Sequence, residues 1–254
     1  MNNTCKNCNT SLIGEYCHKC SQPKDTHRIN IHFLWHDIQH GLLHIDKGIL
    51  YTARELFTRP GHTIRAFLEG KRVQHFKPLS LVIVLAGVYG FLSHYFHINM
   101  LANNISVSGS GEDYIKTKEM VDSISEWLAT HYSIFAIAQI PVYSIATFLA
   151  FRKAGYNFIE HLVLNMFLTG QRLLLHIFAF PLYYAFNETP RLRTTARVVD
   201  IIGYLLMIWA IYQLFHTFNI KQKILRIGLG LLMVVLMNIS ILLLIFKVAL
   251  HSIK

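Results

Sequence analysis

The sequence predicts an all-α membrane protein with a small N-terminal zinc ribbon, amphipathic interfacial helices and about five transmembrane helices. First, 53% of the 254 residues are hydrophobic and 15% are charged, and the apolar residues gather in runs. Several runs approach the roughly 20 residues that cross a bilayer. Second, all four cysteines lie in the first twenty residues as two CxxC pairs. We therefore expect a zinc ribbon over 1–28, an amphipathic segment over 29–78 and a transmembrane domain over 79–254.

The cysteine pairs are Cys5-x2-Cys8 and Cys17-x2-Cys20, with eight residues between them. Four thiolates at this spacing can reach one zinc ion, and so short a segment has no hydrophobic core to fold around without the metal. Two disulfides or a redox-active CxxC are the alternatives. A polar N-terminus without a secretory signal disfavours disulfides, and no βαβ pattern surrounds either pair. Because a four-cysteine site leaves no open coordination position, we expect the zinc to be structural.

Charge argues against nucleic-acid binding by the ribbon. Residues 1–28 hold four Lys or Arg and two Asp or Glu, so their formal charge is 4 − 2 = +2. A zinc tetrathiolate of charge −2 cancels this excess, which leaves no basic footprint for a phosphate backbone.

Four histidines follow the ribbon at four-residue steps: His32, His36, His40 and His44. At 100° per residue, the apolar residues of 31–56 lie on the opposite arc, so the histidines form the polar face of an amphipathic helix. The outermost two are about 18 Å apart along the axis, so one ion cannot bind all four. Three interpretations stay open: a solvated or headgroup-facing surface, a second metal site, or a pH-sensitive contact surface on His36, His40 and His44.

The amphipathic helix is expected to end at "FTRPG", where Pro60 lacks a backbone donor. A shorter helix follows and ends near Gly70, a plausible C-cap. Cations near the first span gain about 1 kcal/mol each against anionic headgroups. We expect an interfacial elbow that contacts anionic lipids, with a dedicated lipid-phosphate site as the alternative. The candidate headgroup contacts are Arg65, Lys71, Arg72 and Lys77.

Three stretches carry a resemblance: "CKNC…YCHKCSQ", "HIDKGILYTARELFTRPGHTIRAFLEGKR" and Pro78. They resemble a bacterial membrane-protein family of unknown function, which joins a CxxCG…YCxxCGQ zinc ribbon to a D-K-G…T…L…P-G…R…G-K-R…P segment and several spans. Asn9 and Ser21 stand where that family usually has glycine, and Asn tolerates the left-handed backbone better than Ser. The resemblance implies an architecture and no activity. The matching positions are Cys5, Cys8, Cys17, Cys20, Gln22, Asp46, Lys47, Gly48, Thr52, Leu56, Pro60, Gly61, Arg65, Gly70, Lys71, Arg72 and Pro78.

Five spans are expected, over residues 79–100, 133–151, 161–186, 198–218 and 227–246. The charges of the loop after the first span are mostly acidic, whereas Lys and Arg precede the first span and follow the second. By the positive-inside rule we expect a cytosolic N-terminus. The resemblance implies a multi-pass protein of the bacterial inner membrane. Arg191, Arg193 and Arg197 break the rule, because they would lie outside. Reading 161–186 as a hairpin broken at Gly170 would return them to the cytosol.

A polar stripe favours a single helix over that hairpin. Asn165, Thr169, Arg172 and His176 share one helical face, which a hairpin would divide. An arginine near the bilayer centre costs about 3 kcal/mol, so Arg172 should face the bundle or a wet cavity with a partner. A polar zipper between helices and a path for a solute or ion both fit the stripe. The candidate partners are Gln139, Gln213 and Asn238, whereas Asp200 is expected to lie too near the outer end of its span.

Two function classes follow. One is a structural or regulatory membrane protein whose ribbon and histidine-lined helix dock a cytosolic partner or another copy of the chain. The other is a transporter or channel whose path follows the Arg172 stripe. A lipid-modifying enzyme using Lys71 and Arg72 is less favoured, because the sequence offers no nucleophile–base pair, HExxH helix or carboxylate dyad.

Overall fold

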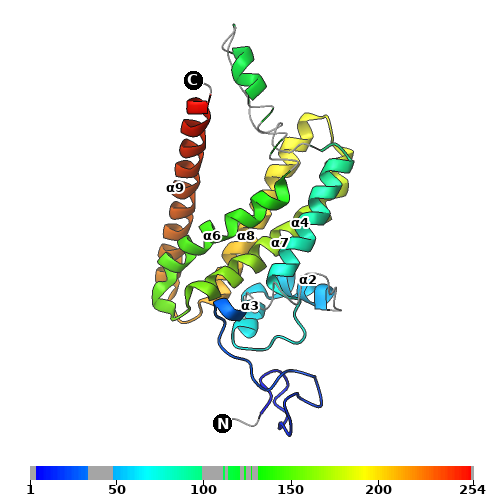
Figure 1. The fold of residues 1–254 in the computed structure, drawn as a ribbon, viewed down its shortest axis with the longest axis vertical. Helices are drawn as coiled ribbons and strands as arrows, with labels where there is room; N and C mark the ends of the chain where they lie inside the picture. The colour runs from blue at the N-terminus through cyan, green and yellow to red at the C-terminus, as the bar shows by residue number, and fades with distance from the viewer. Residues whose placement is uncertain are drawn as a thin grey trace.

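The computed structural model describes residues 4–33, 48–98, 111, 114–120, 123, 127 and 131–252 (Figure 1). In these ranges every regular element is helical, and five helices are long and apolar enough to cross a membrane. The ribbon has only isolated β-bridges, Thr4 with Ser11 and Tyr16 with Pro23. The predicted all-α fold class with five candidate spans is confirmed.

Two short helices precede the candidate spans, α2 (Gly48–Thr58) and α3 (Pro60–Leu68). Successive long helices alternate in direction, so the ribbon lies at one end of the bundle and the C-terminus lies at the other (Figure 1). A 3-10 turn, η1 (Arg152–Ala154), follows the second long helix. The long helices are α4 (Pro78–Tyr95), α6 (Tyr132–Phe151), α7 (Phe158–Ala185), α8 (Pro190–Leu214) and α9 (Ile220–Ser252).

The central helix is α7, against which α4, α6 and α8 all pack. A capping box opens it: the Asn157 side chain accepts the Glu160 N–H, and the Glu160 carboxylate accepts the Asn157 N–H. Gly170 allows close packing with α4, because a Cβ there would lie 2.8 Å from a methyl carbon of Leu81. The helix is continuous through Gly170, which confirms the single-helix interpretation and excludes the hairpin.

Helices α2 and α3 pack on the ribbon end of the bundle (Figure 1). Leu56, Ile64 and Phe67 are fully buried, and α3 lies across the end of α8. The helices touch at Gly61, where a Cβ would lie 2.6 Å from the Leu214 nitrogen. The Gly61 N–H donates to the Gln213 side chain at 3.0 Å. The absence of a side chain at Gly61 therefore lets α3 approach α8.

Two spans begin earlier than hydropathy predicts, α8 at Pro190 instead of 198 and α9 at Ile220 instead of 227. Their first turns are helical, although their hydropathy is too low for them to be counted as part of a membrane span. Pro190 fits there because the first helical residue needs no N–H donor. The expected histidine surface, His36, His40 and His44, lies outside the described residues. Of that row, His32 is described and is exposed.

Candidate functional site

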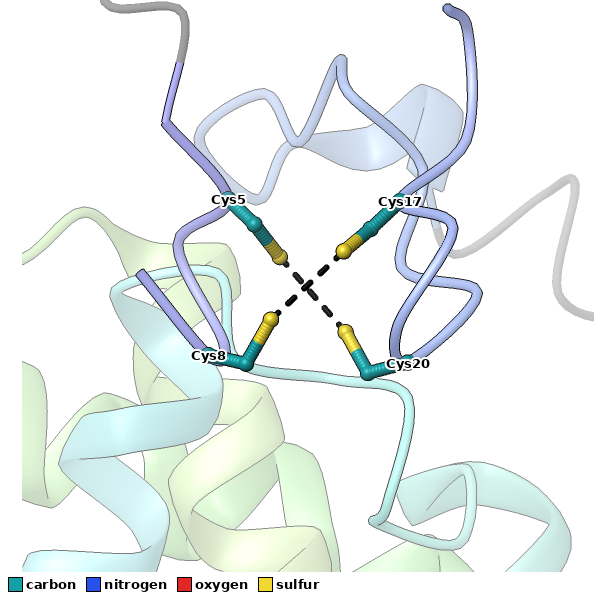
Figure 2. Close-up of side chains that lie close together, drawn as sticks. All are labelled: Cys5, Cys8, Cys17 and Cys20. Atoms are coloured by element: carbon teal, nitrogen blue, oxygen red, sulfur yellow. Dashed lines mark hydrogen bonds between the residues drawn. The ribbon is translucent and has the colours of Figure 1, made fainter. Parts of the chain in front are cut away.

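The four cysteines converge in the ribbon, with their sulfur atoms pointing toward one centre (Figure 2). All four are free, and their Sγ atoms lie within 4.8 Å of one another. Cys5 Sγ lies 3.6 Å from Cys20 Sγ, and Cys8 Sγ lies 3.5 Å from Cys17 Sγ. A tetrahedron with metal–sulfur bonds of about 2.3 Å has sulfur–sulfur edges of about 3.8 Å. The arrangement therefore fits one metal ion, as the spacing of the cysteines predicts.

Each CxxC pair lies on a turn whose last residue has a left-handed backbone. Asn9 has φ 58° and its N–H donates to Cys5 O; Ser21 has φ 60° and its N–H donates to Cys17 O. Glycine adopts this conformation without steric cost, whereas other residues adopt it rarely. The chain thus forms both turns with non-glycine residues.

The first turn also favours the thiolate that a metal requires. Hydrogen bonding with the side chain and backbone of Thr10 lowers the pKa of Cys8 to about 6. The apolar core of the ribbon consists of Leu12 and the cysteines themselves. So small an apolar core contributes little to holding a fold, which is typical of short four-cysteine segments that can bind a metal ion.

A set of polar side chains, which we call the ribbon seat, joins the ribbon to the bundle. It comprises Gln22, Arg28, Arg72, Asn157 and Glu160. The Gln22 side chain is 1% exposed, and its Oε1 accepts the N–H groups of Arg72 at 3.2 Å and of Val73 at 3.0 Å. The Arg72 guanidinium donates to His27 O at 2.7 Å. Burial lowers the pKa of Arg72.

The second half of the ribbon seat lies at the start of α7. Arg28 donates from Nε to Oε1 of Glu160 at 2.9 Å and from Nη2 to Oε2 at 2.7 Å. This bidentate pair raises the pKa of Arg28. The Asn157 side chain donates to Ile29 O at 2.9 Å. Sequence analysis missed this contact, although the capping-box pattern "NFIE" before an apolar run marks its α7 half.

Two further polar contacts bond α2 and α3 to neighbouring parts of the bundle end. The Thr52 hydroxyl accepts the Phe76 N–H at 2.7 Å. The Arg65 guanidinium donates to the last carbonyls of α8, those of Gln213 and Leu214. Arg65 and Arg72 are thus engaged within the protein. Headgroup contact by Lys71 and Lys77 stays a prediction.

A second group of polar side chains, the membrane polar cluster, lies where the second half of α7 faces the middle of α8. It comprises Arg172, His176, Tyr183 and Asp200. Asp200 Oδ1 lies 3.3 Å from Arg172 Nη2 and 3.4 Å from His176 Nε2. His176 Nδ1 lies 2.9 Å from the Tyr183 hydroxyl. Tyr89 of α4 contacts the His176 ring edge-on.

The expectation that Asp200 would miss Arg172 in depth is wrong. Because α8 begins at Pro190, Asp200 lies roughly 15 Å along the helix from its start. The expected partners are engaged elsewhere or lack a contact: Gln213 accepts from Gly61 and Asn238 donates to Val234 O of its own helix. The buried Oε1 of Gln139 makes no hydrogen bond within the described residues.

The predicted polar stripe of α7 divides between two neighbouring helices. Asn165 donates to the Thr147 hydroxyl of α6 at 2.9 Å, and His161 Nδ1 lies 3.1 Å from the same hydroxyl. Arg172 and His176 instead meet α8. Thr169 lies half-buried between the two groups. The stripe therefore contributes to two helix contacts and does not line one continuous surface.

Comparison with known proteins gives one match. A family described as "Protein of unknown function (DUF3667)" matches residues 46–90, which include α2, α3 and the first part of α4. No curated protein and no solved structure matches the chain. Over those residues the chain is similar to an uncharacterised domain family, and the match covers the segment that packs on the ribbon end of the bundle.

Proposed function

We propose that the chain is a multi-pass protein of the bacterial inner membrane whose cytosolic zinc ribbon is held rigidly on the bundle to dock a soluble protein partner. The ribbon seat is the observation that carries this proposal. Buried Gln22 and Glu160 join the ribbon to the bundle through side-chain bonds, which a loosely tethered domain would not need. A rigid mounting presents one ribbon face at a fixed height and orientation above the membrane.

Zinc is the metal that the donor set favours, because four thiolates in tetrahedral reach suit zinc or iron, and zinc is the usual structural ion. Elemental analysis of the full chain should find one zinc per protein. Cys17→Ser should abolish binding, while Ser11→Ala, an exposed change in the same loop, should retain it. Colourless protein with zinc supports the proposal, whereas iron, or no metal at all, contradicts it.

A cytosolic ribbon is supported by the cations at that end of the bundle. Three arginines at the far end, in the first turns of α8, oppose this orientation but are outnumbered: Arg191, Arg193 and Arg197. All native cysteines lie in the ribbon, so an introduced cysteine gives a clean test. Glu188→Cys, in the turn after α7, should react with an impermeant maleimide in spheroplasts, and Lys153→Cys should not; the reverse labelling contradicts this orientation. The ribbon-end cations are Lys71, Lys77, Arg152, Lys153, Lys221, Lys223 and Arg226.

The docking face is proposed at the loop between the cysteine pairs, where Ile13 is 91% and Tyr16 is 67% exposed. A photoreactive residue at position 16 of the full chain, illuminated in native membranes, should yield one discrete protein adduct. The same probe at His18, an exposed position of the second turn, is the matched control. Adducts of equal pattern at both positions, or adducts with lipid alone, count against docking at this face.

A transporter or channel is the second candidate. It is favoured by the membrane polar cluster, where the side chains of Arg172 and Asp200 remain 36% and 35% exposed half-way along their helices. Charged groups at this depth mark substrate or proton pathways in many membrane proteins. Solute or proton flux in liposomes that is lost in Arg172→Leu would favour this function, while a ribbon-dependent protein adduct without flux would favour docking.

A further inference from the structure

We propose that metal binding in the ribbon controls the membrane bundle by completing the N-terminal cap of α7, with Arg28 as the residue that transmits metal occupancy. The inference rests on the proposed zinc centre. It goes beyond docking, because it gives the ribbon a metal-responsive role toward its own transmembrane helices.

Two routes lead from the metal centre to the linker over 26–28. In the first, Lys6, which lies between Cys5 and Cys8, donates from Nζ to Thr26 O at 2.7 Å. In the second, Gln22 O accepts the N–H of Cys17, while its side chain holds the loop at Arg72. Arg72 in turn donates to His27 O. Both cysteine turns are thus bonded to the linker or to the loop beside it.

The linker then bonds to both members of the α7 capping box. Arg28 spans the two carboxylate oxygens of Glu160 and also donates to Gly155 O at 2.6 Å. Asn157 donates to Ile29 O and accepts the Glu160 N–H at 2.8 Å. Glu160 is 4% exposed, so without the guanidinium its carboxylate would be a buried charge with fewer partners.

Loss of the metal therefore acts at a distance from the sulfur atoms. The ribbon loses its fold, and the linker loses the bonds from Lys6 and Gln22 that order it. Arg28 then separates from Glu160, and the first turn of α7 loosens. Since α7 is the helix on which α4, α6 and α8 pack, the loosened turn lies at the ribbon end of the helix that those three share.

Hydrogen–deuterium exchange on the full chain in lipid nanodiscs tests the coupling. Removing the metal with a zinc chelator should speed exchange about tenfold at the amides of Glu160 and His161, which Asn157 caps, and at those of Arg72 and Val73. Reloading with Zn²⁺ should restore slow exchange, and Mg²⁺ should not. The middle of α7, near Arg172, should keep its protection.

Arg28→Gln should uncouple the two regions. In the zinc-bound variant, the backbone amides of the ribbon should stay protected, while those of Glu160 and His161 should already exchange quickly. Removing the zinc should then raise the exchange rates of Glu160 and His161 less than twofold. Arg59→Gln is the matched control, because Arg59 also pairs with a nearly buried carboxylate, Glu55, away from the linker. That variant should retain the full metal dependence at α7.

If Arg28→Gln fails to accumulate, Asn157→Ser keeps a helix cap and removes only the bond to Ile29. It should reduce the metal dependence at Glu160. Chelation that speeds exchange in residues 4–26 alone overturns the coupling, while zinc content and partner adducts report separately on the proposed function. A chain that never binds zinc contradicts both.

Discussion

The ribbon seat and the membrane polar cluster both hold charged side chains, but they satisfy them differently. In the ribbon seat, buried Glu160 receives two short bonds from Arg28 and one from the backbone, and Gln22 accepts two backbone N–H groups. In the cluster, the contacts of Asp200 are 3.3 and 3.4 Å long, and the carboxylate is about one-third exposed.

From this difference we expect the two groups of side chains to serve different roles, one in stability and the other in activity. A buried side chain that holds several short bonds is fixed once the fold is made, because losing a bond leaves it unpaired away from water. Longer pairs that remain partly exposed can exchange partners or protonate without unfolding the chain. The ribbon seat should therefore govern stability, and the membrane polar cluster should govern whatever the bundle does.

The largest effect is expected at Gly61, where α3 meets the end of α8. Gly61→Ala would place a Cβ against Gln213 and the backbone of α8, and should cost about 3 kcal/mol of stability through overpacking. Thermal unfolding in detergent and membrane abundance measure it. Gly87→Ala in α4, where a Cβ would meet nothing within 4 Å, is the control and should change stability little. Equal thermal stability and membrane abundance of the two variants would contradict a close α3–α8 contact at Gly61.

The second effect concerns the cluster and uses a double-mutant cycle. Arg172→Leu or Asp200→Leu alone should each cost about 2 kcal/mol, because each leaves a charge half-way through the membrane; partial exposure reduces the penalty. The double variant should recover most of that stability. If the cluster is functional, the double variant folds yet loses the phenotype. If the double variant recovers both stability and phenotype, the cluster serves only to hold the helices together.

Sequence reasoning succeeded where the pattern is local. The cysteines lie within sixteen residues, and their spacing alone predicted that their sulfur atoms would lie within reach of one metal ion. The continuous α7 was predictable because Asn165, Arg172 and His176 share one helical face. The polar first turns of α8 were not predictable, because their mean hydropathy is too low for a membrane-span window. The start of α8 was therefore placed eight residues too late, which put Asp200 at the wrong depth.

The ribbon seat could not be predicted for a different reason. Arg28 and Glu160 are 132 residues apart, and neither charge is unusual in its own surroundings. Only the packing of α7 beside the linker brings them together. The histidine row illustrates the opposite case, a conspicuous local pattern whose last three members lie outside the described residues, so its interpretations stay predictions.

A third effect tests the ribbon half of the seat. Gln22→Ala removes the acceptor for the Arg72 and Val73 N–H groups and should cost about 1.5 kcal/mol, since water replaces part of the loss. Limited proteolysis near residue 24 should become faster while zinc content stays at one per chain. Gln74→Ala, an exposed neighbour, serves as the control. If Gln22→Ala cleaves no faster than this control, the ribbon is held by other contacts.

The smallest effect is a gain. Ser21 adopts φ 60°, so Ser21→Gly should relieve backbone strain and stabilise the metal-bound ribbon by about 1 kcal/mol. Asn9→Gly should gain less, because Asn tolerates this conformation. Competition with a coloured zinc chelator measures the zinc affinity of both variants. A larger gain in affinity for Asn9→Gly than for Ser21→Gly would contradict this ranking.

The separation of Arg28 from Glu160 also sets an order of events during biosynthesis. A ribosome adding roughly 5–20 residues per second needs on the order of ten seconds to make the intervening chain. The ribbon therefore emerges while α4 and α6 are still being made. The bidentate pair closes only after the start of α7 has left the ribosome, so its formation marks a nascent chain in which α4 and α6 have already been synthesised.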